Sequence, residues 1–81
     1  MPNIDTLKGG IKINIYPNDH VPPHIHAIYG EHEALINICN QEILKGFLPK
    51  AHQYTVQTYV SENEEDLLEV FFQLNPKIIR K

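Results

Sequence analysis

Residues 24–38, with the sequence HIHAIYGEHEALINI, decide the fold because two alternating segments meet at Gly30. Alternation of apolar and polar residues with a period of two is typical of a half-buried β-strand. The connection through residues 30–32 is short, so the two segments are expected to pair as an antiparallel hairpin. The first segment, residues 24–29, places Ile25, Ala27 and Tyr29 on one face and His24, His26 and Ile28 on the other. The second segment, residues 33–39, places Ala34, Ile36 and Ile38 on one face.

The segments on either side of this hairpin extend the same pattern. Upstream, Ile11, Ile13 and Ile15 alternate with polar residues and indicate another strand. Downstream, residues 42–45 predict a short strand that pairs back through a turn at Asn40. Every connection is too short to hold a crossover helix, so neighbouring strands are expected to be antiparallel. The first half of the chain therefore predicts an antiparallel meander of three to four strands.

The second half of the chain changes to helical spacing. Beyond Pro49, which suits the first turn of a helix, residues 51–59 show intervals of three and four. Ser61 followed by Glu64 has the spacing of a capping box and predicts the start of a second helix. Strands followed by helices predict an α+β domain, with both helices packed on one face of the sheet. The apolar residues of the second helix are Leu67, Val70, Phe71 and Leu74 on one stripe, with Leu68 and Phe72 beside it, either in the core or in an interface.

Composition and charge limit the class of protein. With 81 residues, 42% of them apolar and 21% charged, the chain is expected to form one globular domain over residues 1–81. The net charge of -3 disfavours tight binding to a phosphate backbone, since cations cluster only at Lys77, Arg80 and Lys81. The N-terminal residues lack the pattern of a secretory signal and the single Cys39 cannot form an internal disulfide, so a cytoplasmic location is expected.

The histidines of residues 19–30, DHVPPHIHAIYG, form the candidate functional site. His24 and His26 project from the same face of a strand, and neutral imidazole is the most common metal ligand. His20 lies across a proline-containing loop and could supply a third ligand, while Asp19 could be a ligand or orient a ligating ring. Asp19, His20, His24 and His26 are therefore candidate ligands of a divalent metal such as zinc, which His32 could join across the hairpin.

The same histidines also suit catalysis without a metal. Two imidazoles with different pKa values can act as general base and general acid, as a metal-independent ribonuclease requires. His20, His24 and His26 are the candidate catalytic residues. A third interpretation is a solvent-exposed sheet edge on which the histidines have no function. Tyr16 or Tyr29 could supply a hydroxyl to an acid–base reaction, and Lys12 or Lys50 could stabilise the negative charge that develops on a phosphate. His52 is expected to be an exposed residue of the first helix.

The chain resembles the small prokaryotic family known as domain of unknown function 4160. The resemblance runs nearly end to end, through DHVPPHIHAIYG, GIKINIY, ALINI, LKGFLPK and EEDLLEVF. It implies a toxin-like member of a toxin–antitoxin-type pair, with an antitoxin-like protein as partner. The positions that carry the family motif are Asp19, His20, Pro22, Pro23, His24 and His26, with Tyr29 and Gly30 closing it.

Two functions follow as hypotheses. The first is an RNA-cleaving enzyme that uses His20, His24 and His26 as acid–base residues or as metal ligands. The second is a non-catalytic metal-binding or interaction module. Such a module would dock a partner, or a second copy as a homodimer, through the broad apolar surface of residues 67–74. Metal content, molecular mass and RNA cleavage distinguish the two.

Overall fold

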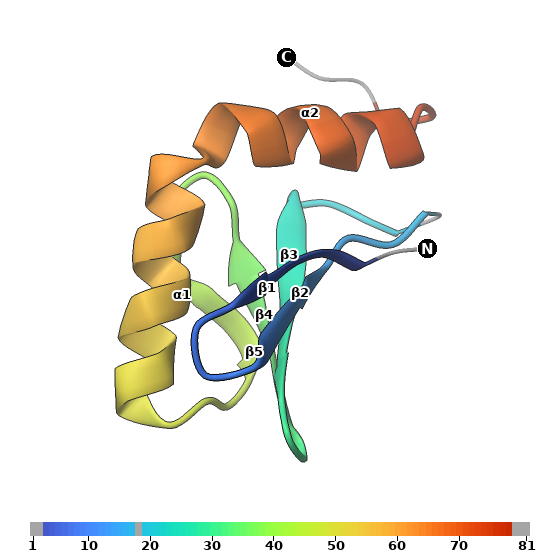
Figure 1. Ribbon diagram of the computed structural model, residues 1–81. Coiled ribbons are helices and arrows are strands. Elements are labelled where there is room, and N and C mark those ends of the chain that lie inside the picture. Colours follow the sequence, from blue (N-terminus) through green and yellow to red (C-terminus); the bar gives the residue numbers. More distant parts are fainter. Residues whose placement is uncertain (1–2, 18, 79–81) are drawn as a thin grey trace.

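A computed structural model describes residues 3–17 and 19–78. Within these residues the strands pair only with their neighbours in the chain, all antiparallel, in the order β1-β2-β3-β4-β5 (Figure 1). The predicted α+β class and antiparallel meander are therefore confirmed. The elements are β1 (Asn3–Leu7), β2 (Ile11–Asn14), β3 (His24–Tyr29), β4 (His32–Asn37), β5 (Ile43–Gly46), α1 (Lys50–Glu62) and α2 (Glu64–Leu74).

The prediction of three to four strands was wrong because it omitted β1. This strand lies at the sheet edge and shows no regular alternation of burial, so its side chains give no period-two signal. Backbone pairing with β2 holds it instead, with Leu7 opposite Ile11. The intervening turn contains two glycines with positive φ, and the Gly10 N–H donates to the carbonyl of Leu7 at 3.0 Å. A glycine pair before an alternating segment was the available signal for this hairpin.

The hairpin of β3 and β4 follows the predicted pattern. Ile25 lies opposite Ile36 and Ala27 opposite Ala34, and all four side chains are fully buried. Because side chains alternate across a strand, the histidines of β3 project from the opposite face. The hairpin therefore assigns its apolar residues to the core and its histidines to a separate site.

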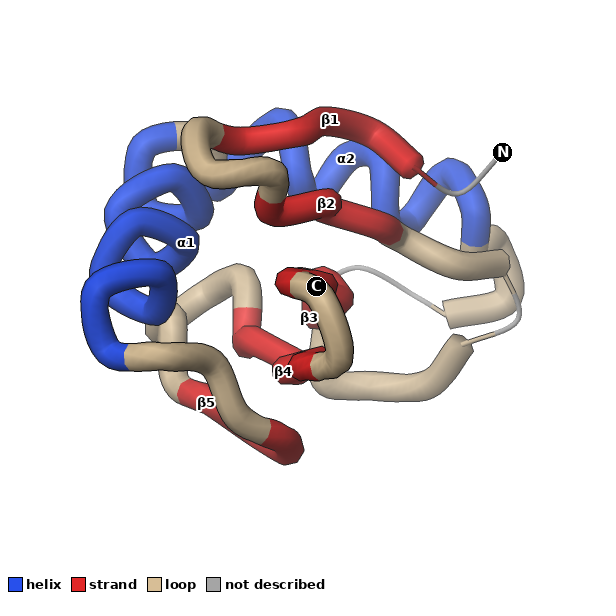
Figure 2. Tube along the Cα trace, turned by 60° about the horizontal axis from the view of Figure 1, so that its bottom comes forward, coloured by secondary structure: helices blue, strands red, loops and turns tan. Residues whose placement is uncertain are grey.

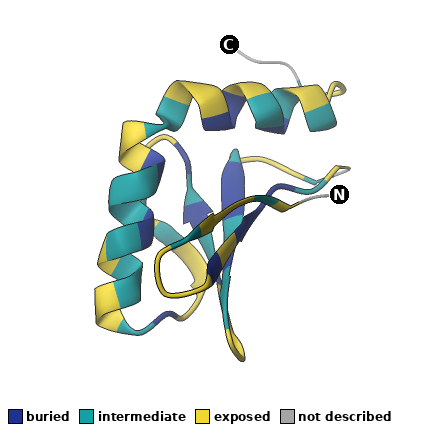
Figure 3. Ribbon diagram, in the orientation of Figure 1, coloured by how far each residue is buried: buried dark blue, intermediate teal, exposed yellow. Residues whose placement is uncertain are grey.

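The two helices cover different parts of the sheet, and both contribute buried residues to one core that includes its apolar face. The strands curl around α1, while α2 lies across the end of the sheet at which β3 begins (Figures 1 and 2). Leu68 is only 7% exposed, so it belongs to the core and not to an interface. Neither helix of the described ranges has the length and apolar character needed to cross a membrane. Buried residues lie on the inner sides of both helices, on the sheet and in the adjoining loops (Figure 3). The buried apolar residues are Ile11, Ile13, Ile15, Ile25, Ala27, Ala34, Ile36, Ile38, Leu48, Val56, Val60, Leu67, Leu68 and Phe71.

The junction between the helices differs from the predicted capping box. Ser61 lies within α1, and α2 begins at Glu64 after Asn63, without a side-chain cap among the described residues. The Asn63 side chain instead donates to the carbonyl of Tyr59 at 2.9 Å. The backbone N–H of Asn63 also donates to the carbonyls of Tyr59 and Val60, so Asn63 ends α1 with both groups on its last carbonyls, and α2 starts directly after it.

Candidate metal centre

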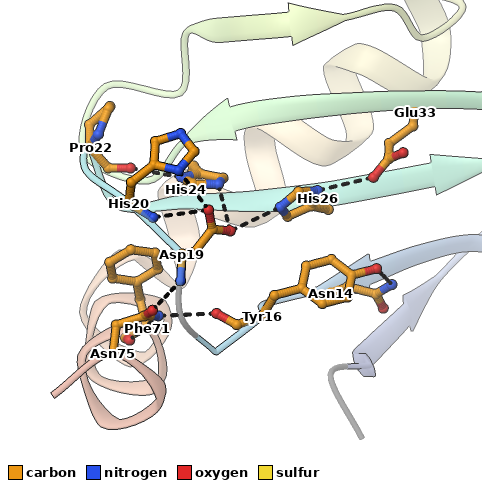
Figure 4. Close-up of polar contacts among 10 residues, drawn as sticks. All are labelled: Asn14, Tyr16, Asp19, His20, Pro22, His24, His26, Glu33, Phe71 and Asn75. Atoms are coloured by element: carbon orange, nitrogen blue, oxygen red, sulfur yellow. Dashed lines mark hydrogen bonds and ion pairs between the residues drawn. The ribbon is translucent and has the colours of Figure 1, made fainter. Parts of the chain in front are cut away.

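The candidate site lies beneath the end of α2, where the loop between β2 and β3 meets the first residues of β3 (Figure 4). Asp19, from the loop, is at its centre with a side chain only 14% exposed. Asp19 Oδ2 is 3.0 Å from His24 Nε2 and 3.2 Å from His26 Nε2. The other oxygen, Oδ1, is 3.2 Å from His20 Nδ1. One carboxylate therefore contacts all three histidines of the motif.

His24 is held in one orientation and is almost fully buried. Its exposed fraction is 2%, because α2 covers this end of β3 and the Phe71 ring lies 5.8 Å from the imidazole, centroid to centroid. His24 Nδ1 is 2.7 Å from the carbonyl oxygen of Pro22, which only accepts, so the hydrogen-bond network assigns the proton to Nδ1. In the neutral imidazole, Nε2 then presents a lone pair toward Asp19.

The Nε2 atom of His24 has an unusual environment. It is the one buried side-chain nitrogen or oxygen of residues 3–17 and 19–78 that lacks a hydrogen-bond partner. Asp19 Oδ2 is within ion-pair distance, but the contact does not have hydrogen-bond alignment. A proton on Nε2 would therefore be poorly satisfied. Two ligands of one metal ion also have this relation, because the lone pair of each is directed at the ion and not at the other ligand.

His26 is oriented in the same manner by a second acceptor. Its Nδ1 lies 3.0 Å from Glu33 Oε2, to which it donates, and its Nε2 is directed toward Asp19. The Tyr16 ring packs edge-on against the imidazole at 4.6 Å. A metal-binding histidine commonly donates its other N–H to a carbonyl or a carboxylate, and both histidines of β3 do so here.

Together, three side chains offer donor atoms to one point. One ligand atom from each of Asp19, His24 and His26 lies within 4.8 Å of the other two. Metal–ligand bonds in tetrahedral zinc sites are about 2.0–2.2 Å long, which separates neighbouring donors by roughly 3.3 Å. The two contacts to Asp19 Oδ2 are close to that separation. Two imidazoles and a carboxylate would leave further coordination positions open.

The charge of Asp19 suits this arrangement. Burial by itself would raise the pKa of the Asp19 carboxyl. In the metal-free protein with both imidazoles protonated, the backbone N–H of His20, hydrogen bonding from His26 and the positive charges of His24 and His26 outweigh it. The pKa of Asp19 is therefore lowered from its ordinary value. The carboxyl group is an anion at neutral pH, as a metal ligand must be.

His20, the third predicted histidine, contacts Oδ1 of Asp19 and not the Oδ2 that His24 and His26 share. Its side chain is 83% exposed, and it is not one of the three residues whose ligand atoms converge. The Val21–Pro22 peptide bond in the loop that follows is cis. His20 is thus placed to contact a molecule from solvent, whereas His24 is not.

The remaining predicted residues lie elsewhere. His32 and Tyr29 are paired at the opposite end of β3, where His32 packs against Phe47 and Tyr29 packs against His52. His52 is half-buried, and not exposed as predicted. Lys12 lies opposite Ile28 in the sheet, Lys50 begins α1, and Cys39 is exposed. Arg80 and Lys81 lie outside the described residues.

Asn75 and Glu33 belong to the site although the sequence patterns did not indicate them. Asn75, at the end of α2, is 4% exposed and accepts a hydrogen bond from the Asp19 backbone N–H at 2.6 Å. Nothing in the spacing could signal a contact across 56 residues. Glu33 carried a weak signal, because the predicted hairpin places it near His26 across the strands.

Asp19 also lines a surface cavity of about 240 Å³ at the end of α2. Its other lining residues are Asn75, Pro76, Lys77 and Ile78. Asp19 and Lys77 are the charged residues among them.

Comparison with known proteins identifies a family. A family model described as Domain of unknown function (DUF4160) matches residues 10–71. The match includes β2 to β5, α1 and all the motif residues from Asp19 to Gly30. Neither the curated proteins nor the solved structures give a match.

Proposed function

We propose that this chain, which belongs to the DUF4160 family, is a divalent-metal protein whose centre is formed by Asp19, His24 and His26. Zinc is the first candidate, because two imidazole nitrogens and one carboxylate oxygen form a common ligand set of zinc sites with an open position. Iron(II) or manganese would suit the same donors. Cys39, which could offer a softer ligand, is exposed and outside the converging set.

The observation that carries this proposal is the buried Nε2 of His24. Leaving a buried polar atom without a partner costs about 1–3 kcal/mol, so an evolved protein rarely retains one without a reason. A bound cation removes this cost by using the lone pair. A solvent-exposed sheet edge does not account for a histidine that is 2% exposed and fixed through its other nitrogen by Pro22.

The coordination positions that three ligands leave unfilled support hydrolytic chemistry. A bound zinc ion lowers the pKa of a coordinated water to about 7 and so supplies hydroxide at neutral pH. His20, exposed beside Asp19, is available as a general acid or base toward a bound substrate. Catalysis by His24 and His26 without a metal is less well supported, because the buried Nε2 of His24 cannot reach a substrate directly.

RNA cleavage by a toxin-like member of a toxin–antitoxin-type pair in the cytoplasm remains the specific form of this proposal. Lys77 beside Asp19 supports an anionic substrate such as a phosphodiester, although the net charge of -3 limits binding to a long phosphate backbone. An antitoxin-like protein is the proposed partner. The alternative is a metal-binding module without catalysis.

Metal binding is tested by dialysis of the purified protein against Zn²⁺ followed by metal analysis. We expect close to one zinc per chain for the wild type and a large loss for His26→Ala. His32→Ala removes a histidine at the opposite end of β3 and should retain the metal. Equal zinc content in His26→Ala and His32→Ala would exclude the proposed centre.

Catalysis is tested by incubating zinc-loaded wild type and His20→Ala with RNA. We expect His20→Ala to keep its zinc and to lose most of the cleavage. If both proteins leave RNA intact, the enzyme hypothesis fails and the metal-binding module remains.

Self-association is tested separately, by light scattering. The apolar surface of α2 offers less than the sequence suggested, since Leu68 is buried. The exposed apolar side chains include Leu44, in the edge strand β5, and Phe47, directly after it. A homodimer would have twice the 9.4 kDa mass of the chain. A mass of one chain at high concentration would contradict the homodimer.

A further inference from the structure

We infer that Asn75 is the positioning residue of the Asp19 centre. It fastens the loop that carries Asp19 to the last turn of α2 and thereby sets Asp19 Oδ2 against His24 and His26. The metal-dependent part of this inference rests on the proposed function, whereas the positioning of Asp19 does not.

Asn75 uses both ends of its amide group in long-range hydrogen bonds. Its Oδ1 accepts from the Asp19 N–H at 2.6 Å, and its Nδ2 donates to the carbonyl of Tyr16 at 3.1 Å. The same Nδ2 donates to the carbonyl of Phe71 at 2.9 Å, within its own helix. Tyr16 and Asp19 are three positions apart in the sequence, so Asn75 holds two points of the chain between β2 and β3 against α2 (Figure 4).

The chemistry of the position favours asparagine. One acceptor and two donor hydrogens are needed within a single, 4% exposed side chain. Aspartate would offer the acceptor but no donors for the two carbonyls, and a small apolar residue would leave three backbone groups unsatisfied. Asn75 therefore not only follows the last residue of α2 but also holds the backbone of Tyr16 and Asp19.

Both halves of the centre depend on the same helical turn. Phe71, whose carbonyl Asn75 binds, packs its ring against His24. The loop half, Asp19, is held by Asn75 itself. Metal binding and the docking of the end of α2 should consequently be coupled, and thermodynamic linkage makes the coupling reciprocal.

The experiment compares Asn75→Ala with Val60→Ala, a control that truncates a buried residue of α1. Co²⁺ is the probe, because its visible spectrum reports the ligands. We expect Asn75→Ala to weaken Co²⁺ binding by roughly tenfold to a hundredfold, as other residues that orient metal ligands do. Its spectrum should also change, while Val60→Ala keeps the wild-type affinity and spectrum. Wild-type affinity and spectrum in folded Asn75→Ala would overturn the inference.

Measurements on the metal-free protein separate this inference from the proposed metal. The Asp19 amide should exchange slowly with solvent in the wild type and rapidly in Asn75→Ala. The imidazole nitrogen shifts of His24 and His26 should change in Asn75→Ala and not in Val60→Ala. If the wild type binds no Co²⁺ but these differences appear, the metal proposal fails and the positioning role stands. A rapidly exchanging Asp19 amide in the wild type overturns the positioning role, even if Asn75→Ala does not fold.

Discussion

Replacing Asp19 by asparagine should abolish the stabilisation of the folded protein by zinc. The substitution keeps the size of the side chain but removes the anionic ligand that contacts both His24 and His26. The donors come from a loop and from β3, and they converge only when the loop is docked beneath α2. Because the unfolded chain does not contain this arrangement, most of the metal-binding free energy appears as folding free energy.

The magnitude follows from linkage. A ligand at 100 times its Kd stabilises the native state by about 2.7 kcal/mol. For a chain of this length, each kcal/mol of stabilisation shifts the Tm by about 4–8 °C. Zinc at about 100 times its Kd should therefore raise the wild-type Tm by about 11–22 °C. The Asp19→Asn protein should show a shift close to zero.

The assay is thermal unfolding followed by circular dichroism, with Zn²⁺ and with a chelator. Asp66→Asn makes the same chemical change at an exposed residue of α2 and should keep the full zinc shift. Glu33→Gln weakens the orientation of His26 and should reduce the affinity by about tenfold to a hundredfold. An equal zinc shift in Asp19→Asn and the wild type would refute the ligand role of Asp19, and the absence of a shift in the wild type would refute the centre.

Further predictions concern the core, the turns and pH. Phe71→Ala should lower the free energy of unfolding by about 3–5 kcal/mol, because the ring is fully buried, and urea unfolding measures the loss. A loss well under 1 kcal/mol would contradict that packing. Gly46→Ala should destabilise far more than Gly30→Ala, whose cost should be about 1–2 kcal/mol for a residue with positive φ. A Cβ at Gly46 would collide with the carbonyl oxygen of Glu33, whereas the space at Gly30 is open, so equal unfolding midpoints would disprove this account. In metal-free protein, the lowered pKa of Asp19 contributes stability that is present above the ordinary aspartate range and is lost as the pH falls through the lowered value. Acid should thus destabilise the wild type more than Asp19→Asn, and parallel stability curves at low pH would count against this contribution.

The hairpin of β3 and β4 shows how far local pattern extends. A strand has only two faces, so the positions of Ile25 and Ala27 determined those of His24 and His26. Burial of Ile25, Ala27, Ala34 and Ile36 confirmed this pattern. The edge strand β1 was missed for the opposite reason, because backbone pairing without a regular apolar face leaves no such pattern in the sequence.

Local signals also compete, and packing decides between them. Ser61 and Glu64 fit a capping box, yet Asn63 lies at the junction because its side chain and backbone N–H satisfy carbonyls at the end of α1. Leu68 could have joined either the core or an interface. Its burial follows from the position of α2 across the sheet end, which helical periodicity does not specify.

By itself, the sequence determined the α+β class, the antiparallel meander and the common face of His24 and His26, because each depends on residue spacing within one or two neighbouring strands. The tertiary structure decided which residues complete the site. It placed Asp19 between the two imidazoles, left His20 exposed and buried His24 beneath Phe71. Those positions depend on α2 and on Asn75, whose contact with Asp19 spans 56 residues, and the geometry of such a contact arises only when the whole chain has packed.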